Sequence, residues 1–280
     1  MLNVIFAILI SNLLSGVHGR SIPKREQIVA TIKDKKGQVY DCVDFYDQPT
    51  FTHPSFKNIS ETAVVRTKTD PNTKFLGGEG SPSLYKPAAD GNGEWSSARM
   101  KLQNGPDSIE VGWMVNPTFF NDKEAHLYVR FTAGQTSCIN TQCPGFVHVG
   151  TEHEDDGNWW VSMDNDKYGI RYWPKTLFTG LADVATEVEW GGEVSVDPEA
   201  KTIPEMGNGK FPLYDTKSSS YMLHVTVVDE TRHNVNPTNT EKFKTSKEVY
   251  NVIDAGYQGD YFGHLILFSG PATPSVWAPN

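Results

Sequence analysis

The sequence predicts an all-β protein: an antiparallel β-sandwich of the jelly-roll type, preceded by a small extended N-terminal segment. Its 280 residues include 24 Gly, 17 Pro, 14 Phe, 11 Tyr and 7 Trp, a composition that favours short strands and many turns over helical bundles. After residue 93, short runs with strand-like hydrophobicity follow one another, separated by turn residues. Antiparallel strands at this spacing are typical of a sandwich.

Residues 1–19 have the features of a secretion signal. An apolar stretch from Leu2 to Leu14 is shorter than a membrane span, and Val17 and Gly19 occupy the −3 and −1 positions of a cleavage site. We therefore expect a secreted, extracellular protein that has no membrane association once the signal is removed. A short membrane anchor is the alternative.

Residues 20–76 are expected to form an extended segment that serves as an activation peptide. Charged and isolated apolar residues alternate there, and 47–56 contains two prolines and little periodicity. From 77 to 93 the chain is rich in Gly and Pro, which indicates loops or turns. The β-sandwich domain is expected to occupy 77–280, and a cut between Phe56 and Gly77 would release it.

Eight segments of this domain are predicted to be strands from their hydrophobic patterns and flanking turn residues. They are 109–115, 126–132, 146–149, 159–163, 170–173, 187–196, 221–228 and 262–268. Only 177–188 has a pattern that could hold a helical turn or two.

The cysteines and one asparagine fit an oxidising, secretory compartment. Cys138 and Cys143 are close enough in sequence for a turn-closing disulfide, which leaves Cys42 over. A zinc site is the alternative, but it would need more thiols or paired histidines nearby. Asn58 begins Asn-Ile-Ser, so one surface glycan is predicted there.

Charge and motif content exclude several classes of function. A formal net charge of −9 offers no basic excess for nucleic acid or an anionic membrane surface. Two histidines and four carboxylates gather in 148–156, which we interpret as a polar loop, with a divalent-metal cluster as the alternative. The run 164–169 begins like a calcium loop, but Lys175 stands where the bidentate glutamate should fall. We expect no metal and no cofactor.

Strand alternation selects two glutamates. In 109–115 the apolar residues share one face and Glu110 lies on the other; in 187–196 Glu193 likewise faces away from Trp190. Each glutamate has a glycine beside it on its polar face, where a close approach by a substrate backbone is one explanation. The plain interpretation is a pair of solvated strand faces. The alternative is a reacting pair, on neighbouring strands, with converging carboxyls.

Six ordered motifs resemble the neprosin family of plant-type secreted proteins. The motifs are DCVDFYDQPTFTHP (41–54), SIEVGWMVNP (108–117), FTAGQTSCINTQCPGFV (131–147), GNWWVSM with GIRYWP (157–174), VEWGGEV (188–194) and MGNGKFP (206–212). The resemblance implies a glutamic peptidase made as a zymogen, with an activation segment before a β-sandwich catalytic domain. The family's two active glutamates fall here on Glu110 and Glu193, the pair that alternation also selects.

The resemblance further implies an endopeptidase that cleaves on the carboxyl side of proline, so its partners are proline-containing peptides or proteins. Two carboxyls at close range would share a proton and activate a water molecule, which predicts activity at acidic pH. An aromatic pocket suits a proline ring, and its candidates are Trp113, Trp190, Tyr128 and Tyr172. Oligomeric state is not predicted.

Two departures from the family pattern bear on catalysis. The loop between the cysteine pair and Trp159 is short, and Arg99 stands where many relatives carry glutamine. If Arg99 faces the two glutamates, its charge lowers their pKa values and weakens acid catalysis. Two other classes therefore stay open: a β-sandwich glycoside hydrolase, which also uses two carboxylates, and a non-catalytic extracellular binding protein on the same scaffold.

Overall fold

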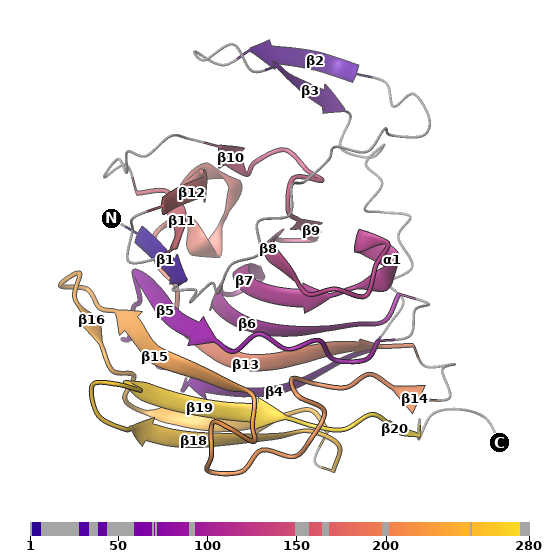
Figure 1. The fold of residues 1–280 in the computed structure, drawn as a ribbon. Helices are drawn as coiled ribbons and strands as arrows, with labels where there is room; N and C mark the ends of the chain where they lie inside the picture. The colour runs from indigo at the N-terminus through magenta and orange to yellow at the C-terminus, as the bar shows by residue number, and fades with distance from the viewer. Residues whose placement is uncertain are drawn as a thin grey trace.

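The computed structural model describes residues 2–6, 28–33, 39–43, 59–68, 70, 72–89, 93–148, 157–163, 168–197, 202–246 and 248–274. Two large sheets pack face to face, which confirms the predicted all-β sandwich (Figure 1).

One sheet carries the candidate site. Its seven strands are all antiparallel to their neighbours. In spatial order they are β17 (Thr240–Lys244), β4 (Ile59–Thr67), β13 (Glu187–Val196), β6 (Trp95–Asn104), β7 (Asp107–Val115), β8 (His126–Ala133) and β9 (Thr136–Ile139). Because residues directly opposite each other share a face, the pairing register decides which side chains can meet.

The second sheet is packed against the first. Its main path is β10 (Val147–His148), β12 (Tyr168–Trp173), β11 (Trp159–Met163), β1 (Leu2–Phe6), β5 (Gly77–Pro82), β15 (Tyr221–Val228), β19 (His264–Ser269) and β18 (Asn251–Tyr257), with β16 (Asn234–Val235) beside β15. Strand β1 is parallel to both of its neighbours. It lies within the predicted secretion signal, whose removal stays a prediction.

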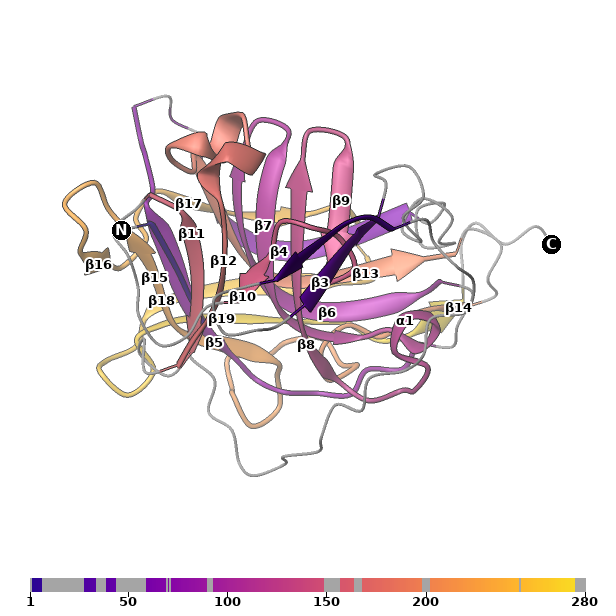
Figure 2. The same cartoon turned by 90° about the horizontal axis from the view of Figure 1, so that it is seen from above.

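The remaining elements are small. Strands β14 (Thr202–Ile203) and β20 (Thr273–Pro274) form one pair, and β2 (Ile28–Lys33) and β3 (Val39–Val43) form another. Both views place the β2–β3 pair over the β8–β9 end of the seven-stranded sheet (Figures 1 and 2). A one-turn helix α1 (Pro117–Phe120) follows β7, and the 3₁₀ turns η4 (Lys175–Leu177) and η5 (Gly180–Ala182) precede β13.

All eight predicted strands are present, with small differences at their ends. The predictions 159–163 and 187–196 coincide with β11 and β13. In the predicted strand 146–149, Phe146 lies outside β10 and residue 149 lies outside the described residues. Phe262 lies in the turn before β19. The helical turn predicted within 177–188 is η5.

Four strands, β2 to β5, lie in the two segments that the sequence predicted to be irregular. Strand β4 falls in the segment expected to be an extended arm, yet it pairs with β13 on one side and β17 on the other. Strand β5 is the glycine-rich run Gly77–Pro82, whose composition resembles a loop but whose backbone pairs with β15. Removal of β4 would expose the edge of β13. Release of an activation segment, and the position of the cut, stay predictions.

The main core lies between the two sheets. The site-bearing sheet contributes an apolar face that includes Met100, Leu102, Ile109, Val111, Val188, Trp190 and Val194. The other sheet contributes Met222, Val225, Val227, Ile266 and Phe268. Burial of this face fixes the register of β6, β7 and β13, because a slip of one residue would turn every core side chain outward. The same constraint fixes the direction in which the two glutamates point.

Candidate active site

Glu110 and Glu193 converge on the face of the sheet opposite the main core. The prediction of neighbouring strands is wrong, because β6 lies between β7 and β13. The prediction of converging carboxyls agrees with the geometry: one atom, Arg130 Nη2, lies 2.7 Å from Glu110 Oε2 and 3.2 Å from Glu193 Oε2. The two Oε2 atoms are therefore no more than about 6 Å apart, the sum of these two contact distances.

Arg130 binds Glu110 through a two-pronged ion pair. Its Nε lies 3.0 Å from Glu110 Oε2, and its Nη2 lies 2.9 Å from Glu110 Oε1. The two residues face each other across the β7–β8 ladder. The guanidinium carbon also lies 5.2 Å from the centroid of the Trp95 ring. This arrangement holds Arg130 in one orientation, with Nη2 directed at both glutamates.

Arg99 approaches the same carboxylates from β6. Its Nε donates to Glu193 Oε2 at 2.5 Å and lies 3.8 Å from Glu110 Oε2. Its Nη1 is 2.9 Å from Glu189 Oε2, which also pairs with Lys101 at 3.1 Å. The sequence raised the question of whether Arg99 faces the glutamates, and the structure places it between them. Arg99 therefore contacts all three carboxylates of a buried ion-pair network. The network consists of Glu110, Glu189, Glu193, Arg99, Lys101 and Arg130.

The polar face that carries this network is buried, so its interpretation as a solvated face is wrong. Arg99 is 1% exposed, Glu110 4% and Glu193 7%. Trp95, Met114 and Tyr128 form a second apolar cluster on this face. Burial of charges is tolerated here because each carboxylate has a cationic partner within hydrogen-bond distance.

The two glycines beside the glutamates have a structural explanation. A Cβ on Gly112 would lie 2.0 Å from the carbonyl oxygen of Ala98 on β6. A Cβ on Gly191, whose φ is +149°, would lie 2.4 Å from the carbonyl oxygen of Ala63 on β4. The backbone that approaches these glycines closely is thus that of the neighbouring strands, and the glycines do not indicate a substrate.

The electrostatics of the network keep Glu193 ionised. Burial raises its pKa, but Arg99 and then Arg130, together with Lys101 and a hydrogen bond from Ser60 Oγ, outweigh burial and hold the pKa of Glu193 well below its ordinary value. Ser60 Oγ donates to Glu193 Oε1 at 2.6 Å. Burial also raises the pKa of Tyr128, with the Glu110 charge adding to it, so the Tyr128 hydroxyl keeps its proton. That hydroxyl donates to Glu110 Oε2 at 3.4 Å.

Of the four aromatic candidates, the structure brings only Tyr128 to the glutamates. Trp190 lies fully buried in the main core, where its Nε1 donates to the carbonyl of Glu79 at 3.0 Å. Trp113 faces the opposite side of β7 from Glu110 and lines a separate cavity. Tyr172 lies on β12 of the other sheet and packs against Trp160, with ring centroids 4.7 Å apart. A proline pocket made of these four residues together is excluded.

Arg130 and Ser60 are site residues that the sequence interpretation missed. Arg130 had a usable signal, because alternation in 126–132 places it beside Tyr128 on one face and the β7–β8 hairpin brings it opposite Glu110. No sequence signal pointed to Ser60, because it is 133 residues from Glu193 and lies in a segment predicted to be extended.

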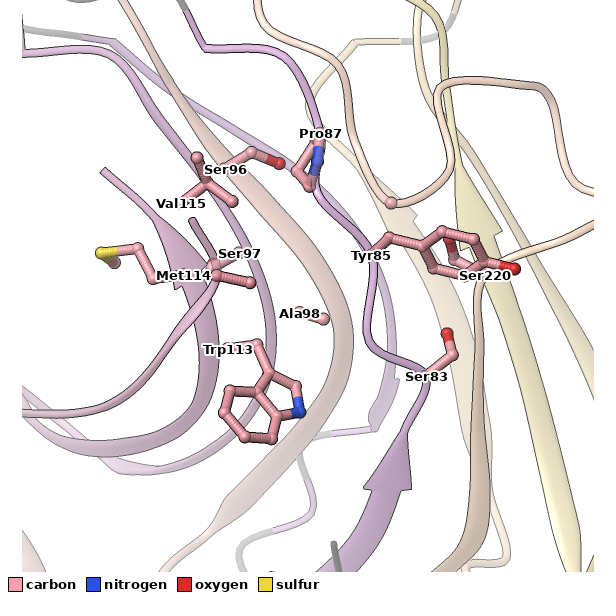
Figure 3. Close-up of a pocket in the computed structure, with 12 residues that line it drawn as sticks. Ser83, Tyr85, Pro87, Ser96, Ser97, Ala98, Trp113, Met114, Val115 and Ser220 are labelled. Atoms are coloured by element: carbon pink, nitrogen blue, oxygen red, sulfur yellow. The ribbon is translucent and has the colours of Figure 1, made fainter. Parts of the chain in front are cut away.

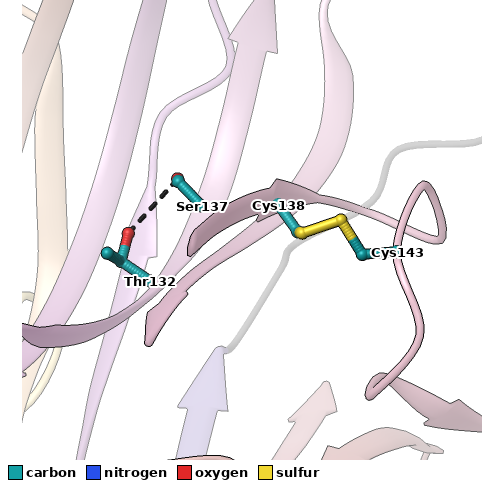
Figure 4. The surroundings of a disulfide bond; sticks show 4 residues. All are labelled: Thr132, Ser137, Cys138 and Cys143. Carbon is teal, nitrogen blue, oxygen red and sulfur yellow. Dashed lines mark hydrogen bonds between the residues drawn. A yellow bond between two sulfur atoms is a disulfide. The ribbon is translucent and has the colours of Figure 1, made fainter. Parts of the chain in front are cut away.

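The predicted disulfide is confirmed: Cys138 and Cys143 are joined, with their Cα atoms 5.9 Å apart, at the end of β9 (Figure 4). Beside it, Thr132 Oγ1 donates to Ser137 Oγ at 3.2 Å (Figure 4). Asn58 and residues 149–156 of the predicted polar loop lie outside the described residues, as do the side chains of Cys42 and His148.

The described residues hold neither a cluster suited to a metal ion nor a helix suited to span a membrane. No group of three or more His, Cys, Asp or Glu side chains in the described part of the chain is arranged to hold a metal ion. Within those same residues, every helix is too short or too polar to cross a membrane.

The stability of the protein should fall in acid because of Glu193. Its pKa is lowered on folding, so its stabilising contribution is complete above the unfolded value, near pH 4.3, and is lost as the pH falls below that. We expect the urea midpoint to be constant between about pH 7 and pH 5 and to decrease below about pH 4. In Glu193→Gln this acid decrease should be smaller. A midpoint that rises between pH 5 and pH 3 would contradict the lowered pKa.

The fold defines a class: all-β proteins of two packed sheets, here with two buried glutamates on one face of the seven-stranded sheet. A comparison with protein families agrees, because the Neprosin family model matches residues 92–154 and 151–271. The chain belongs to the Neprosin family. Membership supports peptidase-like activity in general, and it gives no support to the glycoside hydrolase alternative.

Proposed function

We propose that this protein is a secreted endopeptidase that hydrolyses peptide bonds on the carboxyl side of proline, with Glu193 as its general base. The observation that carries the proposal is the convergence of Glu110 and Glu193 on one guanidinium, in a chain of the Neprosin family. Glu110 is paired twice with Arg130, so we assign it to orienting that arginine and assign proton transfer to Glu193. With two arginines beside them, the two glutamates are therefore proposed to have separate roles and not to share one proton.

The proposed reaction uses one carboxylate twice. Glu193 takes a proton from water while the water oxygen bonds to the scissile carbonyl carbon, and the carbonyl electron pair moves onto oxygen. The same proton then passes from Glu193 to the leaving nitrogen as the C–N bond breaks. A base with so low a pKa is weak, so turnover is expected to be slow.

Arg130 is suited to stabilise the oxyanion of this reaction. Its side chain is 17% exposed, compared with 5% for Glu110, 9% for Glu193 and 1% for Arg99, so it is the member of the four that a substrate can contact most readily. A fixed guanidinium in a site shielded from water stabilises developing negative charge more strongly than water does. Glu110 and the Tyr128 hydroxyl would then be positioning groups that orient Arg130.

The low exposure of both glutamates means that the full-length chain has to open before a substrate can reach Glu193. We propose that secretion is followed by removal of an activation segment that ends before Ile59. This keeps β4, and with it the hydrogen bond from Ser60 to Glu193. The processed protein is therefore the form in which activity should be measured.

The pH dependence of hydrolysis tests this division of roles. With purified, processed protein and a proline-containing peptide, we expect kcat to be nearly constant from about pH 7 down to pH 4 and then to decrease, because Glu193 is already ionised throughout that range. A proton-sharing pair would instead give a maximum in acid with losses on both sides. Cleavage that peaks at about pH 4 and is absent at pH 7 would contradict the proposal.

The ion pairs also favour a second candidate function, a catalytically silent extracellular binding protein. Both carboxylates are satisfied by arginine, and neither needs a water or a substrate to complete its hydrogen bonds. If the processed protein cleaves no proline-containing peptide between about pH 3 and pH 8, this second candidate is the function that the site supports.

A further inference from the structure

Trp113 lines a cavity that the proposed active site does not use. The cavity lies on the opposite side of β7 from Glu110, because consecutive residues of a strand face opposite ways. Figure 3 shows that β6 and β7 bound it on one side, while the segment with Ser83, Tyr85 and Pro87 and the chain at Ser220 bound it on the other. The indole nitrogen of Trp113 points toward the segment that carries Ser83 (Figure 3).

Three buried polar atoms on this cavity have no hydrogen-bond partner among the described residues. They are Nε1 of Trp113, Oγ of Ser96 and Oγ of Ser220, and both serines are only 1% exposed. Leaving such a group buried and unpaired destabilises the folded protein. A cavity lined by three of them is therefore expected to bind a polar group.

The size and chemistry of the cavity restrict what that group can be. The interior of the cavity has room for roughly one water-sized oxygen atom. The indole N–H can only donate, so the oxygen must be an acceptor. Among the described residues that line the cavity none is charged, which disfavours a carboxylate or phosphate. A neutral peptide carbonyl meets all three conditions.

The two chain segments that border the cavity carry most of the exposed large apolar residues. Of seven such residues in the described part of the chain, four lie on segments 83–87 and 207–220: Leu84, Phe211, Leu213 and Tyr214, the last of them 79% exposed. The Tyr85 hydroxyl donates to the carbonyl of Ser219 at 3.4 Å and so joins the two segments. Segment 207–220 reaches the cavity through Gly207 and Ser220, and segment 83–87 through Ser83, Tyr85 and Pro87. Exposed apolar side chains on these two segments favour a ligand that is apolar along its length and offers a carbonyl.

We propose that this cavity binds a proline-rich segment of the peptide substrate, with one backbone carbonyl on the Trp113 indole N–H. An amide that precedes proline has no N–H, so it supplies an acceptor without bringing a donor that would be left unpaired. Extended proline-rich segments also pack their rings on aromatic side chains, here Tyr85 in the cavity lining and the exposed Tyr214 on the adjoining segment. The choice of a proline-containing ligand rests on the proposed function, whereas the site is separate from Glu110 and Glu193.

Binding to the full-length Glu193→Gln protein tests the inference without interference from cleavage. A fluorescein-labelled proline-rich peptide should show saturable anisotropy, and Trp113→Phe, which keeps an aromatic ring but removes the N–H, should weaken binding by about 10-fold. Trp160→Phe is the matched control, because Trp160 packs on Tyr172 away from the cavity. A peptide with alanine in place of proline should bind more weakly.

The exposed Tyr214→Ala variant provides a second test that does not depend on the folding of Trp113→Phe, and we expect it to weaken binding by at least about 3-fold. The inference is overturned if no saturable binding occurs, which would mean that the cavity holds only water, or if Trp113→Phe and Tyr214→Ala both bind like the parent. A wild-type protein that binds the peptide here but never cleaves it would refute the proposed peptidase function alone.

Discussion

Arg99→Ala is expected to destabilise the protein by about 3–5 kcal/mol at pH 7, because it leaves buried carboxylates without their main cation. Arg99 lies 2.5 Å from Glu193 and 2.9 Å from Glu189, and its side chain is 1% exposed. Chemical denaturation of the parent and the variant measures the loss directly. The loss should shrink as the pH approaches 4, since protonation of the carboxylates removes the uncompensated charge.

Arg66→Ala is the matched control on the same sheet. Arg66 also pairs with a carboxylate, Glu241, at 2.7 Å, but the two side chains are 26% and 39% exposed. An ion pair in that position is expected to contribute no more than about 1 kcal/mol. If Arg99→Ala were no more destabilising than Arg66→Ala, the buried network would not be the stabilising feature described above.

The second large effect is a difference between the two glutamates in catalysis. Glu193→Gln should lower kcat by about 10³-fold or more, because it removes the base, whereas Glu110→Gln should lower it by roughly 10- to 100-fold, because it only loosens Arg130. Glu187→Gln, on the same strand and half-buried, should stay within about 2-fold of the parent. Steady-state kinetics of the three variants checks the order, and equal losses in Glu110→Gln and Glu193→Gln would indicate a unit that shares a proton.

Glu189→Gln is unsuitable as a neutral control, although alternation places Glu189 on the same face as Glu193. Its side chain is 7% exposed and pairs with both Arg99 and Lys101. Its removal would leave those two cations with one carboxylate fewer and would alter the charge balance around Glu193. Loss of activity in that variant would therefore not identify a catalytic residue.

The sequence predicted the parts of the site that depend on local pattern. Period-two alternation placed Glu110 and Glu193 opposite the core face, since that face is apolar in both strands. It could not predict that β6 separates β7 from β13, because strand order depends on contacts between residues far apart in the chain. The position of Arg99 between both carboxylates follows from that order.

The burial of the polar face also could not be predicted from the sequence. A run of charged and small residues normally indicates solvent exposure, and only the pairing of each carboxylate with a cation makes burial possible here. Strand β4 was missed because Ile59–Thr67 lies next to a proline-rich stretch and has mixed polarity. Its Ala63 and Val65 belong to the main core, which explains why it is held in the sheet.

The central claim is that the arginines keep Glu193 ionised in the folded protein. The most direct test follows the side-chain carboxyl carbons of ¹³C-labelled glutamate by NMR as the pH is lowered, with Glu193→Gln used to assign the Glu193 signal. We predict that this signal stays at its ionised position down to about pH 4, below which a free glutamate is mostly protonated. A Glu193 signal that shifts to its protonated position above about pH 5 would contradict the account, since it would indicate a carboxyl that shares or holds a proton.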